Sequence, residues 1–480
     1  MSSPITFTQK AFSGAPVREK ELRYLVDAIR HGKCCAVVAP SNMGKSKLLH
    51  SLRTEETRVL CTAKPEKPVV MVFTDCLPLE TEIDFYRQIL NDLLFELEDV
   101  AERRERNLNI PLRVLSQLKR DRDELMSTES GGKALLVLDQ ALRRLLRKTN
   151  LKIVFIWDEF EGIFERLPGR TFRKFRALRD TTRAKMICVL GVTRRLNQIR
   201  PENDLFEFRE VFKMNTLVLQ PLNRNDSERF LQYMTEINDY DLDASWKDLV
   251  YLLSGGHPGL MERTLNLFAR GYVMPESEDV IEALYHDRRL REECRRLWEE
   301  IDQSERDTLL DLAMNNTLAD DGAAELLLET GILRKKGSRY CIFSPLFARL
   351  VLKQLSESKG LELKGNRIYL DDRDITDKLG VGELDLLLFL FKYPGKYFTT
   401  PEIYWKLNKK VAEEKDKASI RKSVQRARQV IEPFYHSKEC IYLLNKKGSG
   451  YMLNPNPGSR GSLSLKELSC NYPGKDEALF

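Results

Sequence analysis

A phosphate-binding loop is the feature that most constrains how this chain folds. The apolar run 34–38 leads into the loop 39–44, and Lys45 and Ser46 open a helix-forming stretch. A strand, a tight loop and a helix in this order direct backbone N–H groups and the positive end of the helix at a polyphosphate. Lys45 would neutralise the outer phosphates, and the Ser46 hydroxyl would hold Mg²⁺. The pattern therefore predicts a nucleoside triphosphate site in an α/β fold.

The loop departs from the usual G-x-x-x-x-G-K-[ST] pattern at its first position, where Ala39 replaces glycine. Alanine does not tolerate the backbone conformations that only glycine adopts easily. A chance Gly-Lys-Ser after a buried strand is therefore the alternative interpretation. The residues expected to contact the nucleotide here are Ala39, Asn42, Met43, Gly44, Lys45, Ser46 and Lys47.

A second apolar run, 151–157, ends in two carboxylates, Asp158 and Glu159. A continuous apolar run is typical of a parallel strand that is buried on both faces. Asp158 would hold Mg²⁺ through water, and Glu159 would orient or deprotonate the water that attacks the γ-phosphate. The alternative is an acidic pair that simply opens the following helix.

A third apolar run, 185–192, is followed by Thr193 and Arg194. Ligands collect at the carboxyl ends of strands in doubly wound sheets, so this hydroxyl and this guanidinium are predicted to sense the γ-phosphate. An ordinary polar loop is the alternative. Lys45, Glu159 and Arg194 are therefore the residues expected to take part in catalysis.

Together these segments resemble the STAND branch of the AAA+ ATPases, and more narrowly its prokaryotic AAA-like members. The resemblance implies an α/β P-loop NTPase fold, with a parallel sheet flanked by helices and a helical lid. It also implies ATP or ADP and Mg²⁺ as cofactors. Asn42-Met43 stands where many relatives carry an arginine-bearing loop. Together with Ala39, this difference leaves slow hydrolysis and nucleotide binding without hydrolysis as open alternatives.

Two further segments extend the resemblance to the adenine side of the site. Residues 14–22 resemble the family's N-terminal motif, and residues 253–260 resemble its Gly-x-Pro element in the lid. A capped helix start and a Gly-rich helix N-terminus explain the same segments without a nucleotide. The residues that the resemblance places at the base are Val17, Arg18, His257 and Pro258.

The chain has 480 residues, of which 42% are hydrophobic. It should therefore hold about three or four domains of roughly 100–200 residues each. In STAND ATPases a first winged helix packs on the nucleotide and locks the resting state. We expect an ATPase core over 1–220 with a helical insertion at about 78–149, a lid over 221–285, a first winged helix over 286–358, a second over 360–455 and a flexible tail over 456–480.

Residues 366–453 resemble the OmpR/PhoB-type winged-helix effector domain of response regulators, most specifically at 393–398, 400–403 and 446–451. A basic helix expected over 418–431 has an apolar stripe opposite its cations, so its polar face can enter a major groove. Arginine reads guanine there and glutamine reads adenine, while lysines of the wing contact phosphates. The residues expected to contact DNA are Lys417, Arg421, Lys422, Gln425, Arg426, Arg428, Lys446 and Lys447. A protein-binding module with a solvated basic helix is the alternative.

The net charge of +6 is a mild excess for this length, so the average charge says little about partners. Most basic clusters are mixed with acids at helical spacing, which is typical of solvated helix faces. Some arginines are nevertheless candidates for an arginine finger that reaches a neighbouring subunit's γ-phosphate. These candidates are Arg170, Arg173, Arg176, Arg179 and Arg183.

The nine cysteines lack paired metal spacing, and their odd number argues against a disulfide framework. The N-terminus lacks a basic region followed by an apolar stretch, and the longest apolar runs are too short to span a bilayer. These features predict a cytoplasmic protein that does not insert into a membrane.

The combined interpretation is a nucleotide-switched STAND-like ATPase that controls a DNA-binding winged helix, as in a signal-responsive transcriptional regulator. Double-stranded DNA is the expected partner, and the resemblance also allows a nucleotide-dependent homo-oligomer. Two alternatives come from other functional classes. One is a defence or conflict ATPase that assembles with a protein effector through the C-terminal domain. The other is a transposition-type AAA+ ATPase that loads onto DNA.

Overall fold

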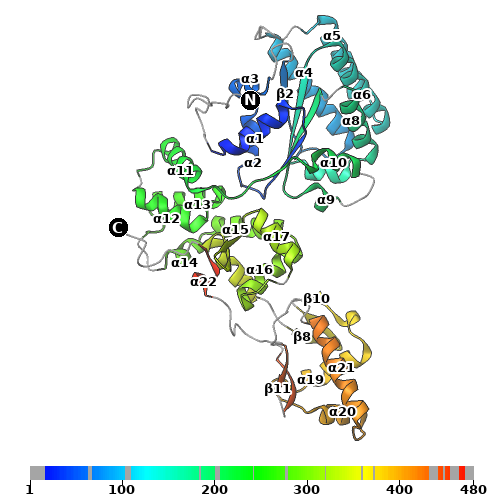
Figure 1. Cartoon of the computed structure of the whole chain (residues 1–480), viewed down its shortest axis with the longest axis vertical. Coiled ribbons are helices and arrows are strands. Elements are labelled where there is room, and N and C mark those ends of the chain that lie inside the picture. The colour runs from blue at the N-terminus through cyan, green and yellow to red at the C-terminus, as the bar shows by residue number, and fades with distance from the viewer. Residues whose placement is uncertain are drawn as a thin grey trace. The chain divides into compact units, whose positions relative to one another are not determined.

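The structure is a computed structural model of the chain, which divides into two compact units (Figure 1). The first unit comprises Met1–Tyr251 and Gly256–Tyr272, and the second comprises Leu252–Gly255 and Val273–Phe480. The residues that the structure describes are 17–62, 68–102, 110–182, 185–200, 206–241, 243–275, 279–318, 320–357, 361–370, 373–431, 442–446, 449–454 and 464–470.

A five-stranded sheet forms the centre of the first unit, with the strand order β2-β3-β4-β1-β5. Each pair of neighbouring strands is parallel. Residues of β1, β3 and β4 are almost all buried, which explains why these strands are continuous apolar runs in the sequence. The predicted parallel sheet of a P-loop fold is confirmed. Its strands are β1 (Cys35–Val38), β2 (Val69–Asp75), β3 (Lys152–Asp158), β4 (Met186–Val192) and β5 (Thr216–Val218).

Helices cover both faces of this sheet (Figure 1). On one side lie α1 (Glu19–Arg30) and α3 (Glu55–Cys61), and on the other lie α4 (Glu82–Glu102), α6 (Gly131–Lys148) and α8 (Gly169–Thr181). The other helices up to residue 269 are α2 (Lys45–Ser51), α5 (Leu112–Met126), α7 (Glu161–Arg166), α9 (Leu196–Ile199), α10 (Phe206–Lys213), α11 (Arg224–Asn238), α12 (Ala244–Ser254) and α13 (Pro258–Ala269).

The predicted helical insertion corresponds to α4, α5 and α6, which follow β2 and precede β3. Leu90, Leu93 and Leu97 on α4 are all fully buried. These leucines recur at the spacing of one helix face, so α4 packs its apolar side against the rest of the unit. The insertion is thus part of the hydrophobic core of the first unit.

The second unit begins with helices and a short hairpin. The antiparallel strands β6 (Leu333–Lys336) and β7 (Arg339–Ile342) pair with Leu333 opposite Ile342. The helices are α14 (Val280–Tyr285), α15 (Arg288–Glu300), α16 (Gln303–Asn315), α17 (Asp321–Glu329) and α18 (Pro345–Glu357).

The end of the chain differs from the expected flexible tail. Residues 464–470 contain the short helix α22 (Leu465–Leu468), and Ser469 forms a parallel bridge with Ile342 of β7. A disulfide joins Cys341 to Cys470, and Leu468 is fully buried. The expectation of a flexible tail is therefore wrong over these residues, and a disulfide is present although the odd number of cysteines argued against a disulfide framework. The two cysteines are 129 residues apart, and sequence spacing does not reveal pairing over such a distance.

We expect Cys470→Ser to lower the free energy of unfolding of the second unit by about 2–4 kcal/mol, because the disulfide closes a long loop of the unfolded chain. Thermal unfolding with and without dithiothreitol measures this change. The reductant should destabilise the wild type and leave the variant unchanged. Thiol titration of denatured protein should find two more thiols after reduction, and equal thiol counts would contradict the disulfide.

The C-terminal part of the second unit has a hydrophobic core of its own. Its basic helix begins at Glu414 rather than at the predicted Ala418, because acidic residues in the first turn favour the positive end of a helix. The elements are β8 (Leu361–Lys364), β9 (Arg367–Leu370), β10 (Arg373–Asp374), η3 (Thr376–Lys378), α19 (Val381–Phe391), α20 (Thr400–Asn408), α21 (Glu414–Ile431), β11 (Leu443–Lys446) and β12 (Gly450–Leu453).

The closing hairpin of this part, β11 and β12, depends on Gly450. This residue has a φ of 89°, and a Cβ atom there would lie 1.9 Å from the carbonyl oxygen of Phe398. Phe398 and Tyr451 exchange backbone hydrogen bonds across the same contact, at 2.8 and 2.9 Å. The close backbone approach therefore requires glycine at this position.

Among the helices of the described ranges, none has both the length and the apolar character that crossing a bilayer demands.

Candidate functional site

The phosphate-binding loop connects β1 to α2. The N–H of Ala39 donates to the carbonyl of Val192 at 3.0 Å, so Ala39 continues the backbone pairing of β1 with β4. The left-handed conformations of the loop occur instead at Asn42 (φ 59°) and Gly44 (φ 85°). Asparagine and glycine adopt this conformation more readily than other residues. Ala39 therefore stands where the backbone of this loop does not need glycine.

Two carboxylates from the end of β3 and the start of α7 face Lys45, the first residue of α2. The Lys45 Nζ atom lies 3.3 Å from Glu159 Oε1 and 3.8 Å from Glu161 Oε1. The Lys45 side chain is 4% exposed, so these ion pairs are largely shielded from water. The structure thus brings together Lys45 and Glu159, the two residues predicted for phosphate binding and for water activation.

Backbone geometry holds Glu159 in this position. Glu159 has a φ of 50°, its N–H donates to Asp158 Oδ1 at 3.0 Å, and the next N–H, of Phe160, donates to the Gly191 carbonyl at 3.0 Å. A left-handed glutamate is uncommon and is found mainly where surrounding contacts impose it, often at functional sites. Burial raises the pKa of Glu159, while nearby Lys45 opposes this rise.

Asp158 is buried at the carboxyl end of β3, and Gly191 of β4 makes room for it. A Cβ atom on Gly191 would lie 2.5 Å from Asp158 Oδ1 and 2.7 Å from Leu49 of α2. Gly191 is a site residue that the sequence interpretation missed. A glycine within an apolar strand is the signal that would have marked a close approach.

The donor set at this edge fits Mg²⁺. Within the described ranges, no three His, Cys, Asp or Glu side chains cluster so as to hold a metal ion. Mg²⁺ is commonly held by one or two protein oxygen ligands together with substrate phosphates and water, rather than by a closed protein cage. The Asp158 carboxylate and the Ser46 hydroxyl are oxygen ligands of this kind, so both residues keep their predicted role as a proposal.

The predicted sensor residues follow β4 directly. The Thr193 N–H donates to Glu161 Oε1, which ties the end of β4 to the start of α7. The Arg194 side chain is exposed. Glu161 is a second residue that the sequence interpretation missed, although it lies only three positions after Asp158.

The predicted adenine-side residue Arg18 contacts the phosphate-binding loop. Its Nη2 donates to the carbonyls of Met43 at 2.7 Å and Gln220 at 2.8 Å, and its side chain is 4% exposed. Its backbone has a φ of 71°, just before α1 begins. Arg18 thus joins the loop to the segment after β5, and Val17 beside it is half-buried.

His257 begins α13, with Pro258 as the first helical residue. The Nδ1 atom of His257 accepts from the Leu260 N–H at 3.3 Å. Burial, with a smaller contribution from the charge of Arg18, lowers the pKa of His257 to about 4. The imidazole is therefore neutral near pH 7.

Several candidate arginine fingers are engaged on their own unit. Arg170 pairs with Glu82 at 2.6 Å, and Arg176 lies 3.6 Å from Asp180. Arg173 is exposed and, within the part of the chain that the structure describes, makes no ion pair. Arg173 is thus the candidate that keeps a guanidinium available to a second subunit.

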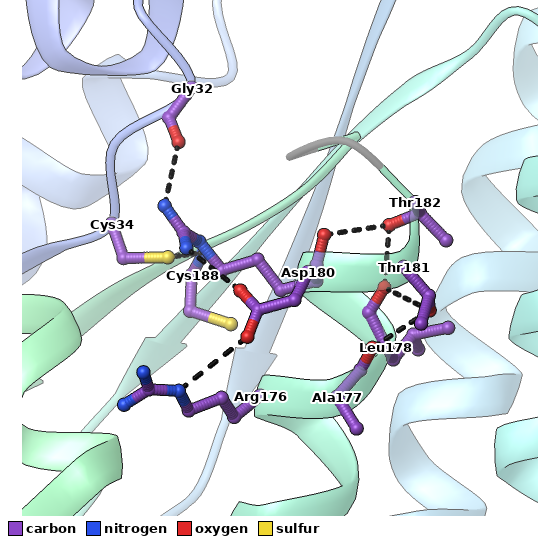
Figure 2. A network of polar contacts seen from close by, with 10 residues as sticks. Gly32, Cys34, Arg176, Ala177, Leu178, Asp180, Thr181, Thr182 and Cys188 are labelled. Carbon is purple, nitrogen blue, oxygen red and sulfur yellow. Dashed lines mark hydrogen bonds and ion pairs between the residues drawn. The ribbon is translucent and has the colours of Figure 1, made fainter.

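Gly32, Cys34 and Cys188 belong to a polar network near the start of β1 (Figure 2). The same network includes Arg179. Its Nη2 donates to the Gly32 carbonyl at 3.3 Å, and its guanidinium lies beside Cys34, whose sulfur accepts from the Cys188 N–H at 3.3 Å. Arg179 therefore stabilises the end of the sheet where β1 starts, away from the phosphate-binding loop at its other end. Arg183 lies outside the described residues.

The basic helix α21 presents one polar and one apolar face. The side chains that face the core are Ile420, Val424, Ala427 and Ile431, and all are buried. The exposed predicted DNA contacts are Arg421, Lys422, Gln425 and Arg426. The helix therefore has the amphipathic arrangement that groove binding needs.

Arg428 does not lie on that exposed face. Its Nε and Nη2 donate to the Leu443 carbonyl at 3.1 and 2.5 Å, so it joins α21 to β11. Its role in base reading stays a prediction, and in this structure its guanidinium is turned toward the hairpin, where it binds a backbone acceptor. Lys417 pairs with Glu414 at 2.6 Å. Lys446 is exposed at the end of β11, and Lys447 lies outside the described residues.

The similarity of the chain to known proteins includes a family model that matches part of the first unit. Residues 28–199 match a protein-family model described as AAA domain. Among solved structures, a Walker-type ATPase of Pyrococcus abyssi is similar at 14% identity and a TM-score of 0.47, over 70% of this chain and 95% of that one. No curated protein matches the chain.

Two proteins of Aeropyrum pernix are also similar in structure. ORC2, solved with ADPNP and ADP, has 11% identity and a TM-score of 0.40, over 73% of this chain and 99% of that one. ORC1, solved in complex with DNA, has 12% identity and a TM-score of 0.36, over 94% of this chain and 92% of that one. Residues 28–199, which match the AAA domain model, thus contain the phosphate-binding loop within a parallel sheet of the P-loop NTPase fold.

Proposed function

We propose that this protein is a STAND-like ATPase whose nucleotide state controls DNA binding by a C-terminal winged helix, and that it acts as a signal-responsive transcriptional regulator. ATP and ADP are the proposed nucleotides, and double-stranded DNA is the proposed partner. The observation that carries the proposal is the exposed cationic face of α21 on a chain that also holds an AAA domain.

In the proposed nucleotide site, Lys45 leaves its carboxylate partners and binds the outer phosphates. Glu159 then orients the attacking water and accepts its proton. Asp158 and Ser46 would hold Mg²⁺, and the ion would neutralise part of the phosphate charge. Arg18 transmits the nucleotide state of the loop to the segment after β5, because its guanidinium contacts both Met43 of the loop and Gln220 of that segment.

In the proposed DNA surface, Arg421 and Gln425 lie one helical turn apart on the exposed face of α21. Arginine is suited to guanine and glutamine to adenine in the major groove. Lys422 and Lys446 supply positive charge for phosphates, which positions the helix without reading sequence. Arg426 is a weaker candidate, since it also lies 3.7 Å from Glu383.

Selection of full-length protein on a pool of random duplexes, with ATP and with ADP and at two salt concentrations, tests this function. We expect enrichment of one sequence that depends on the nucleotide. Arg421→Ala should weaken the binding free energy for the preferred duplex by about 1–3 kcal/mol and relax the preference at one base pair. Lys446→Ala should weaken all sequences alike and lower the salt slope by about 1.

Lys392→Ala is the matched control, because it removes an exposed cation from the same part of the chain. We expect it to leave the sequence preference unchanged. Absence of enrichment in every nucleotide state would reject the regulator and favour assembly with a protein effector. Binding that needs ATP but ignores sequence would favour a DNA-loading ATPase.

A further inference from the structure

The geometry points to Glu161 as a positioning residue that couples the sensor end of β4 to Lys45 and thereby sets nucleotide affinity. This inference rests on the nucleotide site proposed above. One oxygen atom carries both contacts: Glu161 Oε1 accepts the Thr193 N–H and lies 3.8 Å from Lys45 Nζ. The Glu161 side chain is 19% exposed, so water screens these contacts only in part.

The turn between β3 and α7 places Glu161 there. Left-handed Glu159 reverses the chain after Asp158, and the hydrogen bond from the Phe160 N–H to the Gly191 carbonyl fixes the turn on β4. Glu161 is the first residue of α7, so its carboxylate returns to the edge of the sheet where β4 ends. Lys45 consequently faces two carboxylates that come from a single turn.

A lysine ammonium has three donors and no acceptor, so carboxylates and phosphates compete for it. When Lys45 turns to a phosphate, Glu161 keeps its backbone donor at Thr193. The carboxylate of Glu161 therefore opposes phosphate binding through its charge and holds the sensor segment through its hydrogen bond. These two effects belong to the same side chain and can be separated by substitution.

Glu161→Gln removes the charge and keeps an oxygen that can accept from the Thr193 N–H. We expect it to raise ADP affinity about two- to fivefold, the range for a partly exposed ion pair. Glu161→Ala removes the acceptor as well, so it should raise affinity similarly and also lower kcat. Titration calorimetry with ADP and EDTA measures the affinity without any contribution from turnover or metal.

The split between affinity and kcat gives a readout that a purely structural role would not change. Glu161→Gln keeps the acceptor for the Thr193 N–H, so it should raise ADP affinity and keep the wild-type kcat. Glu161→Ala lacks that acceptor, so the difference in kcat between the two variants measures the contribution of the hydrogen bond.

Glu165→Gln is the matched control, because Glu165 is an exposed residue of the same helix α7. It should leave affinity and kcat unchanged. If Lys45→Ala abolishes ADP binding while Glu161→Gln behaves like the wild type, the inference about Glu161 is overturned and the nucleotide site stands. If Lys45→Ala binds ADP normally, the proposed nucleotide site itself fails.

Discussion

Lys45→Ala is expected to weaken ATP and ADP binding by roughly 10- to 150-fold, because a hydrogen bond to a charged group contributes about 1.5–3 kcal/mol. Lys45 begins α2 directly after the phosphate-binding loop, and its ammonium is already buried beside acceptors. Alanine preserves the helix start but removes the ammonium that faces Glu159 and Glu161. Titration calorimetry with each nucleotide measures the loss, and hydrolysis should fall with it.

Lys33→Ala serves as the control for this variant. Lys33 is an exposed lysine just before β1, at the opposite end of that strand from the loop. Its removal changes the net charge equally and should leave nucleotide affinity unaltered. Thermal unfolding of both variants separates a loss of binding from a loss of folding. Retained affinity in a folded Lys45→Ala protein would show that the nucleotide binds elsewhere.

Glu159→Gln is expected to lower kcat by about 10²- to 10⁴-fold while nucleotide binding persists, because it removes the base that activates water. Glutamine has nearly the same shape but accepts no proton. The loss of one carboxylate 3.3 Å from Lys45 Nζ should leave ATP affinity equal or higher. Single-turnover hydrolysis measures the first effect, and calorimetry measures the second.

The pH dependence of the wild type gives an independent check on Glu159. A base works only when it is unprotonated, and burial raises the pKa of this carboxyl above its ordinary value. Activity should therefore fall, as pH decreases, at a higher pH than for an exposed glutamate, whose pKa is about 4.3. If the Glu159→Gln variant hydrolyses ATP at the wild-type rate, another residue is the base.

The parallel sheet and the loop could be predicted from local patterns. The apolar runs that became β1, β3 and β4 are long enough to identify buried strands, and each is followed by the polar residues that the sheet then gathers at one edge. The meeting of Lys45 with Glu159 follows from this topology alone, because parallel strands end on the same side.

The alternation of apolar and basic positions on α21 likewise indicated which side of the helix would be buried. The spacing of apolar residues predicts the buried face of a helix only to within part of a turn. Arg428 lies at the edge between the buried and the exposed face of α21. Whether such a side chain reaches solvent depends on what packs beside it. The carbonyl of Leu443 lies beside Arg428 and binds it, and only the tertiary structure shows this neighbour.

Contacts between segments far apart in the chain also required the tertiary structure. Arg18 donates to Gln220 across 202 residues, and Cys341 bonds to Cys470 across 129. The hydrogen bond between Thr193 and Glu161 depends on the left-handed turn at Glu159. A glutamate at that position does not predict a left-handed backbone. Local sequence patterns encode the period of an element and its ends, whereas such pairings depend on how packed elements bring distant polar atoms together.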